Sequence, residues 1–201
     1  MCWNAEVSLN TFIFGLISAA IVLAINKNEI KLVLILLSVT SMQLLEYFVW
    51  RNINNKEVIK FLSLIGMGII LLQLIFINSF NLKGNERIII LTLIFLSTLF
   101  ALNHIINNDK LKMEKAKNGH LMWHWTDIPL PLLIIILSFY LYAGIRNKDI
   151  LFIFTFITLS ISLFSYYKYK TWGSMWCYIS NFFWLILIAK VIFEYLNRFK
   201  K

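Results

Sequence analysis

The chain has 201 residues, of which 60% are hydrophobic and only 14% are charged, and its mean hydropathy is +0.75. This composition is typical of membrane proteins and excludes an ordinary soluble globular protein. The formal net charge of +9 does not indicate nucleic-acid binding, because lysines and arginines are scattered between apolar runs instead of forming one patch. We therefore expect an integral membrane protein surrounded by membrane lipids, with no nucleic-acid partner.

Seven apolar runs are long enough to cross a bilayer, whose hydrocarbon core of about 30 Å requires about 20 residues of helix. Because unpaired backbone groups are not tolerated in lipid, each crossing run must be helical. The sequence thus predicts an all-α fold, a single multi-pass bundle of about seven transmembrane helices with no soluble domain. The predicted spans lie near residues 7–25, 32–50, 61–80, 88–106, 128–145, 150–166 and 175–196.

The connections between the runs are short, except for residues 107–127, which are long enough for a short interfacial helix. The first run has no basic segment before it and no small-residue cleavage site after it, so we predict no signal peptide. Nine Lys and Arg residues fall on each side of the predicted bundle, so the positive-inside rule does not decide the orientation. The lysine-rich segment 107–127 favours a cytoplasmic N-terminus. These features specify neither the resident membrane nor the oligomeric state, and an oligomer is compatible with them.

Residues that commonly carry chemistry gather on the membrane face that holds the N-terminus. All three histidines, both cysteines and six of the seven tryptophans belong to this face. The gathering predicts a polar pocket, although tryptophans are also enriched at membrane interfaces without any ligand. The residues of the face are Cys2, Trp3, Glu6, Gln43, Glu46, Trp50, His104, His120, Trp123, His124, Trp125, Asp127, Trp172, Trp176, Cys177 and Asn181.

Glu46 is the most informative single residue, because a carboxylate inside a span is costly unless it faces the bundle interior or water and finds a partner. Gln43, Glu46 and Trp50 have the spacing that places them on one side of a helix. We predict Glu46 as a general base with Gln43 beside it in the catalytic site. The alternatives are that Glu46 reaches the interface or makes a structural hydrogen bond.

His120 and His124 have the i, i+4 spacing with which two imidazoles on one helical turn bind a metal ion, and Asp127 falls on the same face. His104 could supply a third ligand for zinc or another transition metal, whose bound water Glu46 would deprotonate. Against this hypothesis, Pro129 and Pro131 are typical of a helix start and interrupt a continuous helix. The alternative is a set of interfacial histidines, with Asp127 or Thr126 capping the fifth helix.

The segment before the last span predicts a helix start, with Gly173 as the turn and Ser174 as the N-cap. The positive end of that helix would point into the same face, where Trp176, Cys177 and Asn181 follow. If the face is exoplasmic, Cys2 and Cys177 are placed to form a disulfide; if it is cytoplasmic, both are expected as free thiols.

Four segments together resemble an uncharacterised family of small multi-pass membrane proteins of large DNA viruses and bacteria. The segments are CWNAEVSLNTF at the N-terminus, MQLLEYFVW in the second span, HLMWHWTDIPLP before the fifth and GSMWCYISN in the last. The resemblance implies a multi-pass membrane fold and a viral or bacterial source, and it implies no activity. The family positions are matched here by Cys2, Trp3, Gln43, Glu46, Trp123, His124, Gly173, Ser174, Trp176 and Cys177.

A fainter resemblance is to seven-helix membrane hydrolases of the alkaline ceramidase and progestin-receptor-like type, which bind zinc through three histidines. Those proteins carry paired histidines in the last helix and an aspartate in the third, and this chain has neither.

Three functional hypotheses follow. The first is metal-assisted or acid-base hydrolysis of a lipid-like substrate in the polar pocket. The second is a small channel or transporter in which Glu46, Gln43 and Asn181 line a path for protons or cations. The third is a membrane scaffold whose aromatic face binds another membrane protein. The sequence alone does not decide whether the protein is an enzyme.

Overall fold

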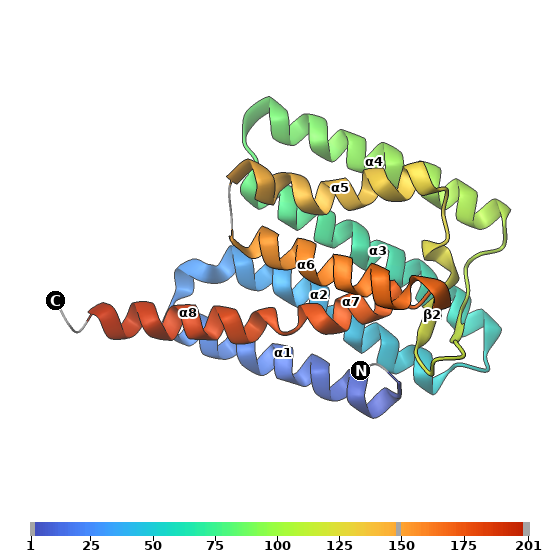
Figure 1. Cartoon of the computed structure of the whole chain (residues 1–201), viewed down its shortest axis with the longest axis horizontal. Helices are drawn as coiled ribbons and strands as arrows, with labels where there is room; N and C mark the ends of the chain where they lie inside the picture. The colour runs from blue at the N-terminus through green and yellow to red at the C-terminus, as the bar shows by residue number, and fades with distance from the viewer. Residues whose placement is uncertain (1–2, 148–149, 199–201) are drawn as a thin grey trace.

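The computed structural model describes residues 3–147 and 150–198, which form an elongated bundle of helices (Figure 1). A small two-stranded hairpin caps one end of this bundle. The helices and strands are α1 (Ala5–Ile25), α2 (Ile30–Arg51), α3 (Lys56–Asn81), α4 (Gly84–Asn107), β1 (Met113–Lys115), β2 (Leu121–Trp123), α5 (Leu130–Asn147), α6 (Ile150–Tyr166), α7 (Trp172–Ser180) and α8 (Phe183–Arg198). Short 3-10 turns η1 (Lys27–Glu29), η2 (His124–Thr126) and η3 (Tyr167–Tyr169) join some of them.

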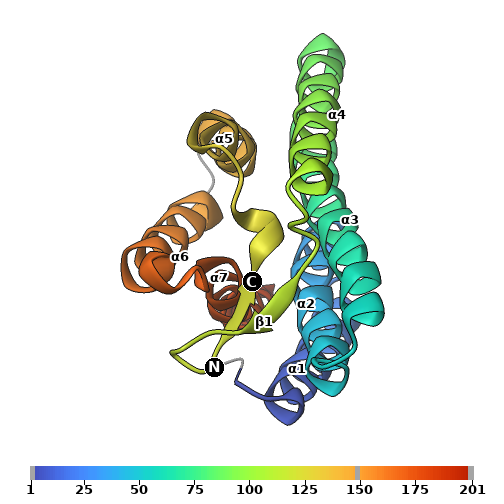
Figure 2. The same cartoon turned by 90° about the vertical axis from the view of Figure 1, so that its right-hand side faces the viewer.

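The helices pack in two layers, which Figure 2 shows end-on. In one layer α1, α2, α3 and α4 lie side by side in chain order, and each contacts the next. The other layer contains α5, α6 and the α7–α8 pair. Contacts of α1 with α8, α2 with α7, and α3 and α4 with α5 join the layers. Chain-order neighbours pack together because their connections are short.

The outer surface of the bundle is apolar, as expected of a protein that spans a membrane. Six described helical segments are long and apolar enough to cross a bilayer, counting α7 and α8 as one. The remaining helix, α6, has 17 residues and a length of about 26 Å, somewhat less than the hydrocarbon core of about 30 Å, so the seventh span stays a prediction. The prediction of an all-α multi-pass membrane bundle is therefore confirmed.

The last predicted span is divided into two helices at Asn181 and Phe182. At this break the backbone N–H groups of Asn181 and Phe182 bond to carbonyls three residues earlier instead of four. The Asn181 side chain also donates to the Cys177 carbonyl at 2.8 Å and accepts a bond from the Thr40 hydroxyl at 2.9 Å. An asparagine that bonds its own backbone and a neighbouring helix favours such a local tightening of the helix.

The long connection between α4 and α5 forms a β-hairpin, so the interfacial helix for which it has the length does not form. Strand β1 pairs antiparallel with β2, with Met113 opposite Trp123. Gly119 has a φ of +84°, which glycine adopts without a steric penalty and which allows the chain to turn between the strands. Leu121 and Trp123 are buried while Met122 between them is less so, and this period of two is that of a strand.

Candidate functional site

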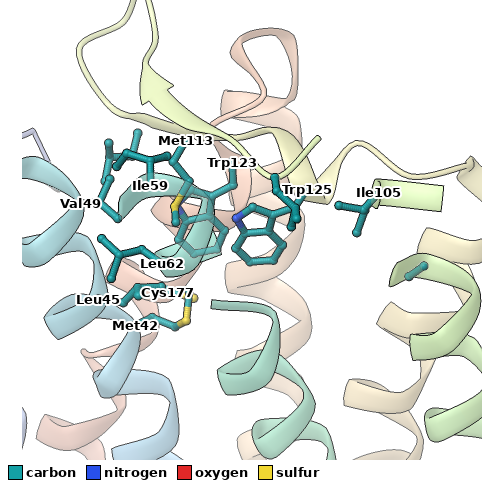
Figure 3. Close-up of a cluster of buried hydrophobic side chains, with 13 residues drawn as sticks. Met42, Leu45, Val49, Ile59, Leu62, Ile105, Met113, Trp123, Trp125 and Cys177 are labelled. Atoms are coloured by element: carbon teal, nitrogen blue, oxygen red, sulfur yellow. The ribbon is translucent and has the colours of Figure 1, made fainter. Parts of the chain in front are cut away.

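The hairpin covers the end of the bundle where α2 and α4 finish and α3, α5 and α7 begin. We call this end, together with the hairpin, the hairpin end, and the opposite end the loop end. Figure 3 shows the Trp123 and Trp125 side chains pointing from the hairpin segment into the bundle, towards Cys177 and Met42. The chain segment between two helices therefore supplies part of the buried core.

The indoles of Trp123 and Trp125 stack with centroids 4.9 Å apart and an interplanar angle of 12°. Two glycines make room for them. A Cβ atom on Gly173 would lie 2.9 Å from Cε3 of Trp123, and one on Gly66 would lie 3.1 Å from Cζ2 of Trp125. Close packing of helices against indole rings explains these glycines, because a methyl group would overlap the rings.

The start of the last span differs from the prediction. Helix α7 begins at Trp172 after Thr171, so Gly173 and Ser174 lie within the helix and Ser174 is not its N-cap. Ser174 is buried instead, and no partner for its hydroxyl is found among the described residues. The Thr171 hydroxyl accepts a bond from the Asn118 side chain at 2.9 Å, which ties the hairpin turn to α7. The helix therefore begins where the hairpin holds it.

Gln43 and Glu46 lie on α2 and are completely buried, with an exposed fraction of 0% for each residue. Glu46 therefore does not reach the membrane interface, which rules out one of the alternatives for this residue. It lies close enough to the Cys177 thiol for a direct electrostatic interaction. A buried carboxyl group at this depth is costly in free energy, so its position in the bundle interior is a specific feature of this chain.

The three histidines have separate surroundings. His104, at the end of α4, lies 3.4 Å from the Lys110 ammonium group, and His124 Nε2 lies 3.0 Å from a Glu114 carboxylate oxygen. His120 is buried between the rings of Trp3 and Tyr166, with centroids 6.1 and 5.7 Å away.

His120 precedes β2 and His124 begins η2, so the two do not share a helical turn and the predicted i, i+4 geometry is wrong. Within residues 3–147 and 150–198, no three His, Cys, Asp or Glu side chains come together as ligands for one metal ion. Burial lowers the pKa of His120 below its usual 6.5, which favours the neutral ring.

Asp127 links two loops of the hairpin end. Its carboxylate lies 2.9 Å from the Lys170 ammonium group and 3.5 Å from that of Lys110, and Lys110 also donates to the Asp127 carbonyl. The hydrogen bond from Lys170 holds the pKa of Asp127 below its ordinary value, although partial burial opposes this shift. Asp127 therefore joins the segment before α5 to the segment before α7, and it does not cap α5, which begins at Leu130.

The other predicted site residues have diverse positions at or near the hairpin end. Trp3 and Glu6 are exposed at the start of α1, and Trp50 packs at the edge of the cluster around Trp123. Trp176 is buried and faces Tyr140, with ring centroids 5.0 Å apart. Asn181 lies deeper, at the break between α7 and α8. Cys2 lies outside the described residues, so its pairing with Cys177 stays a prediction.

A cavity of about 90 Å³ lies between the two helix layers directly beneath the hairpin. We call it the hairpin cavity. Its walls are aliphatic side chains of α3, α4 and α5, together with four indoles and the Cys177 thiol. For three of the indoles, no acceptor for Nε1 is found among the described residues. The four tryptophans that line the cavity are Trp123, Trp125, Trp172 and Trp176.

Glu46 and Gln43 are not among the residues that line the hairpin cavity. The predicted catalytic pair therefore does not face this cavity, although Glu46 lies near Cys177, which does line it. The structure brings four of the six predicted tryptophans and Cys177 to one cavity, and the predicted base is not part of its wall.

The sequence interpretation did not include the aromatic residue that α5 contributes to this cavity, or the hydrogen bonds that join this residue to α3 and α2. Tyr140 of α5 lines the cavity, and its hydroxyl donates to Gln73 of α3 at 2.8 Å. Gln73 in turn donates to the Ser38 carbonyl of α2 at 3.1 Å. An isolated glutamine inside an apolar span was a signal for such a contact, since intramembrane polar groups bond between helices.

Comparison with known proteins adds no functional assignment. No protein-family model matches this chain, and no similar chain was found among curated proteins or solved structures. The resemblance to small viral and bacterial membrane proteins therefore stays a prediction, and the functional argument depends on the geometry of the hairpin end alone.

Proposed function

We propose that this multi-pass membrane protein binds a lipid-like molecule, with an apolar chain seated in the hairpin cavity. The observation that carries the proposal is the cavity itself, an apolar space of about 90 Å³ inside a membrane protein and bounded by four indoles. Protein interiors are normally packed without such spaces, and an apolar cavity does not hold water. An apolar ligand is therefore its natural occupant.

The size and chemistry of the cavity narrow the class of ligand. Pockets for drug-sized molecules are typically about 300–1,000 Å³, so a space of about 90 Å³ holds only a small apolar group or a segment of a hydrocarbon chain. Trp123, Trp125 and Trp176 contribute their rings to the wall, while their indole N–H groups are buried and no acceptor for them is found among the described residues. The wall is therefore largely apolar, which favours the hydrocarbon part of a ligand over its polar group.

Binding is favoured over catalysis because Glu46, the predicted base, is not part of the cavity wall. The histidines lie apart from one another, so they supply no support for metal-assisted hydrolysis. The predicted path for protons or cations has no specific support either. Asn181, one of its predicted residues, is engaged in bonds to Thr40 and to the Cys177 carbonyl that hold α7 against α2.

The test uses a fatty acid brominated along its chain, because bromine quenches the fluorescence of tryptophans that it contacts. Detergent-purified protein is titrated with this probe. We expect saturable quenching for the wild type and its loss in Ala101→Leu, which extends a side chain from α4 into the cavity. Ala20→Leu is the matched control, since Ala20 lies on the exposed side of α1 and its substitution should leave quenching unchanged.

The absence of a saturable component in the wild type would refute the proposal. Equal loss of quenching in Ala101→Leu and Ala20→Leu would also refute it, because the effect would then not depend on the cavity.

A further inference from the structure

A second cavity, of about 100 Å³, lies in the other half of the bundle. Its walls come from α2, α3, α5, α6 and the region where α7 meets α8. The lining includes aliphatic side chains of α2 and α3, with Asn81 at the loop end. We call this space the loop-end cavity.

Tyr140 and Trp176 line both cavities, so their side chains form the wall that the two spaces share. The rings meet edge to face, with centroids 5.0 Å apart and an interplanar angle of 83°. This geometry is favourable for two aromatic rings and closes the gap between α5 and α7. This pair of side chains therefore lies where the two cavities adjoin.

The two rings are held differently. The Tyr140 hydroxyl donates to Gln73, whose amide donates to the Ser38 carbonyl, so Tyr140 is fixed to α3 and α2. For the Trp176 indole N–H, no acceptor is found in the described part of the chain. Trp176 therefore has no comparable polar tether, and it is the ring that can turn at lower cost.

Together the cavities follow a long path through the bundle. Their lining residues on α3 run from Met67 to Asn81, which corresponds to about 21 Å along a helix axis. The hydrocarbon core is about 30 Å thick, so this path is longer than one leaflet. A slender apolar chain that entered at the hairpin end would pass Trp176 before it reached the loop-end cavity.

We infer that Trp176, packed on Tyr140, sets the length of the apolar chain that the protein accepts. This inference rests on the proposed function, and it adds a limit on chain length. Chains that end in the hairpin cavity fit with the aromatic pair closed. Longer chains require Trp176 to turn away from Tyr140 and then occupy the loop-end cavity.

The test compares unbranched fatty acids of increasing length as competitors for the brominated probe. For the wild type we expect competition to strengthen with length up to a limit and then to weaken. In Trp176→Ala the two cavities are joined, so the length that competes best should shift to longer acids. Trp176→Phe, which keeps an aromatic ring at the shared wall, is the matched control and should shift the limit less.

A second substitution locates the added space. Ala143 lines the loop-end cavity only, so Ala143→Leu in the Trp176→Ala background should return the limit towards that of the wild type. If Trp176→Ala is not recovered as folded protein, Trp176→Leu replaces it, because leucine removes the ring and retains part of the buried volume.

The outcomes separate the two proposals. An unchanged length limit in the Trp176 variants, with the probe still bound, would overturn the inference and leave the proposed function standing. A wild type that binds neither the probe nor any of the acids would overturn both. A limit that moves in Trp176→Ala, and moves back with Ala143→Leu, supports the inference.

Discussion

The two ends of the bundle differ in the polar and aromatic side chains that they bury. At the hairpin end, Glu46, His120 and the indoles of Trp123 and Trp176 are turned inward and buried. At the loop end, charged groups lie outside, in exposed or partly exposed pairs such as Lys190 with Glu29 at 2.8 Å. Burying polar groups is costly, and surface ion pairs contribute little to stability. The comparison indicates that polar and aromatic side chains are concentrated in the interior at the hairpin end, whereas the charged groups of the loop end stay near the surface.

The largest effect should follow from removing the indole at the centre of the hairpin end. Trp123 is 2% exposed and stacks on Trp125, so Trp123→Ala should destabilise the protein by about 3–5 kcal/mol. Thermal unfolding in detergent measures this loss. Phe164→Ala is the control, because this ring is 93% exposed on the bundle surface and its loss should cost far less. Equal losses in both variants would contradict the distinction between the buried cluster and the lipid-facing surface.

Two glycines of α3 provide the next test, because they differ in their surroundings within one helix. A Cβ atom on Gly66 would lie 2.9 Å from Cδ2 of Leu45 and 3.1 Å from the Trp125 ring. Gly66→Ala should therefore cost about 1–3 kcal/mol by overpacking. A Cβ atom on Gly68 would have no neighbour within 4 Å, so Gly68→Ala should be neutral or stabilising. Unfolding midpoints compare the pair directly, and a harmless Gly66→Ala would show that the helix and the indole are not tightly packed.

The buried histidine of the hairpin end predicts a pH dependence. Since burial lowers the pKa of His120, the folded protein prefers the neutral ring. Its stability should therefore be greatest above the unfolded-state value of 6.5 and should fall as the pH drops below it.

The measurement is the unfolding midpoint in detergent between about pH 8 and about pH 5, the range in which an unperturbed histidine titrates. His120→Gln should flatten the profile. His124→Gln, which removes a partly exposed histidine at the same end, should retain it. A profile that His120→Gln leaves unchanged would assign the pH dependence to another group.

Asp127 tests the link between the two loops of the hairpin end. Asp127→Asn removes the charge that pairs with Lys170 and Lys110, and the cost should be up to about 1 kcal/mol because the pair is partly exposed. The pKa of Asp127 is lowered in the folded protein, so its charge stabilises the fold above pH 3.8 and this contribution disappears as the pH falls through the lowered value. Chemical unfolding near neutral pH measures the difference between wild type and variant. A loss of several kcal/mol would mean that the carboxylate does more than join two loops.

The smallest effect is expected at the loop end. Lys190→Gln breaks a partly exposed ion pair with Glu29, whereas Asp127 pairs with two lysines, and one such pair contributes about 0–1 kcal/mol. The same unfolding measurement in low and high salt should show little difference between variant and wild type. A larger loss than that of Asp127→Asn would reverse the proposed ranking of the two ends.

The amino-acid sequence by itself determined the membrane class, the helical fold and the end of the molecule where unusual residues gather. Apolar runs of span length permit one solution, because lipid offers no partner to exposed backbone groups. The strand pairing of residues 113–115 with 121–123 was not predictable with the same certainty, since three-residue strands carry little periodic signal. The position of Ser174 was likewise not predictable, because serine is a common N-cap residue but here it is buried within α7.

Only the tertiary structure decided which of the gathered residues share a site. The spacing of His120 and His124 along the chain predicted that both bind one metal ion. In the structure the hairpin buries His120 and leaves His124 partly exposed beside Glu114. Tyr140 and Trp176 are distant in sequence and meet because α5 and α7 lie in the same layer, with α6 between them in the chain. Packing between helices depends on the shapes of many side chains at once, and the local pattern of one segment does not contain that information.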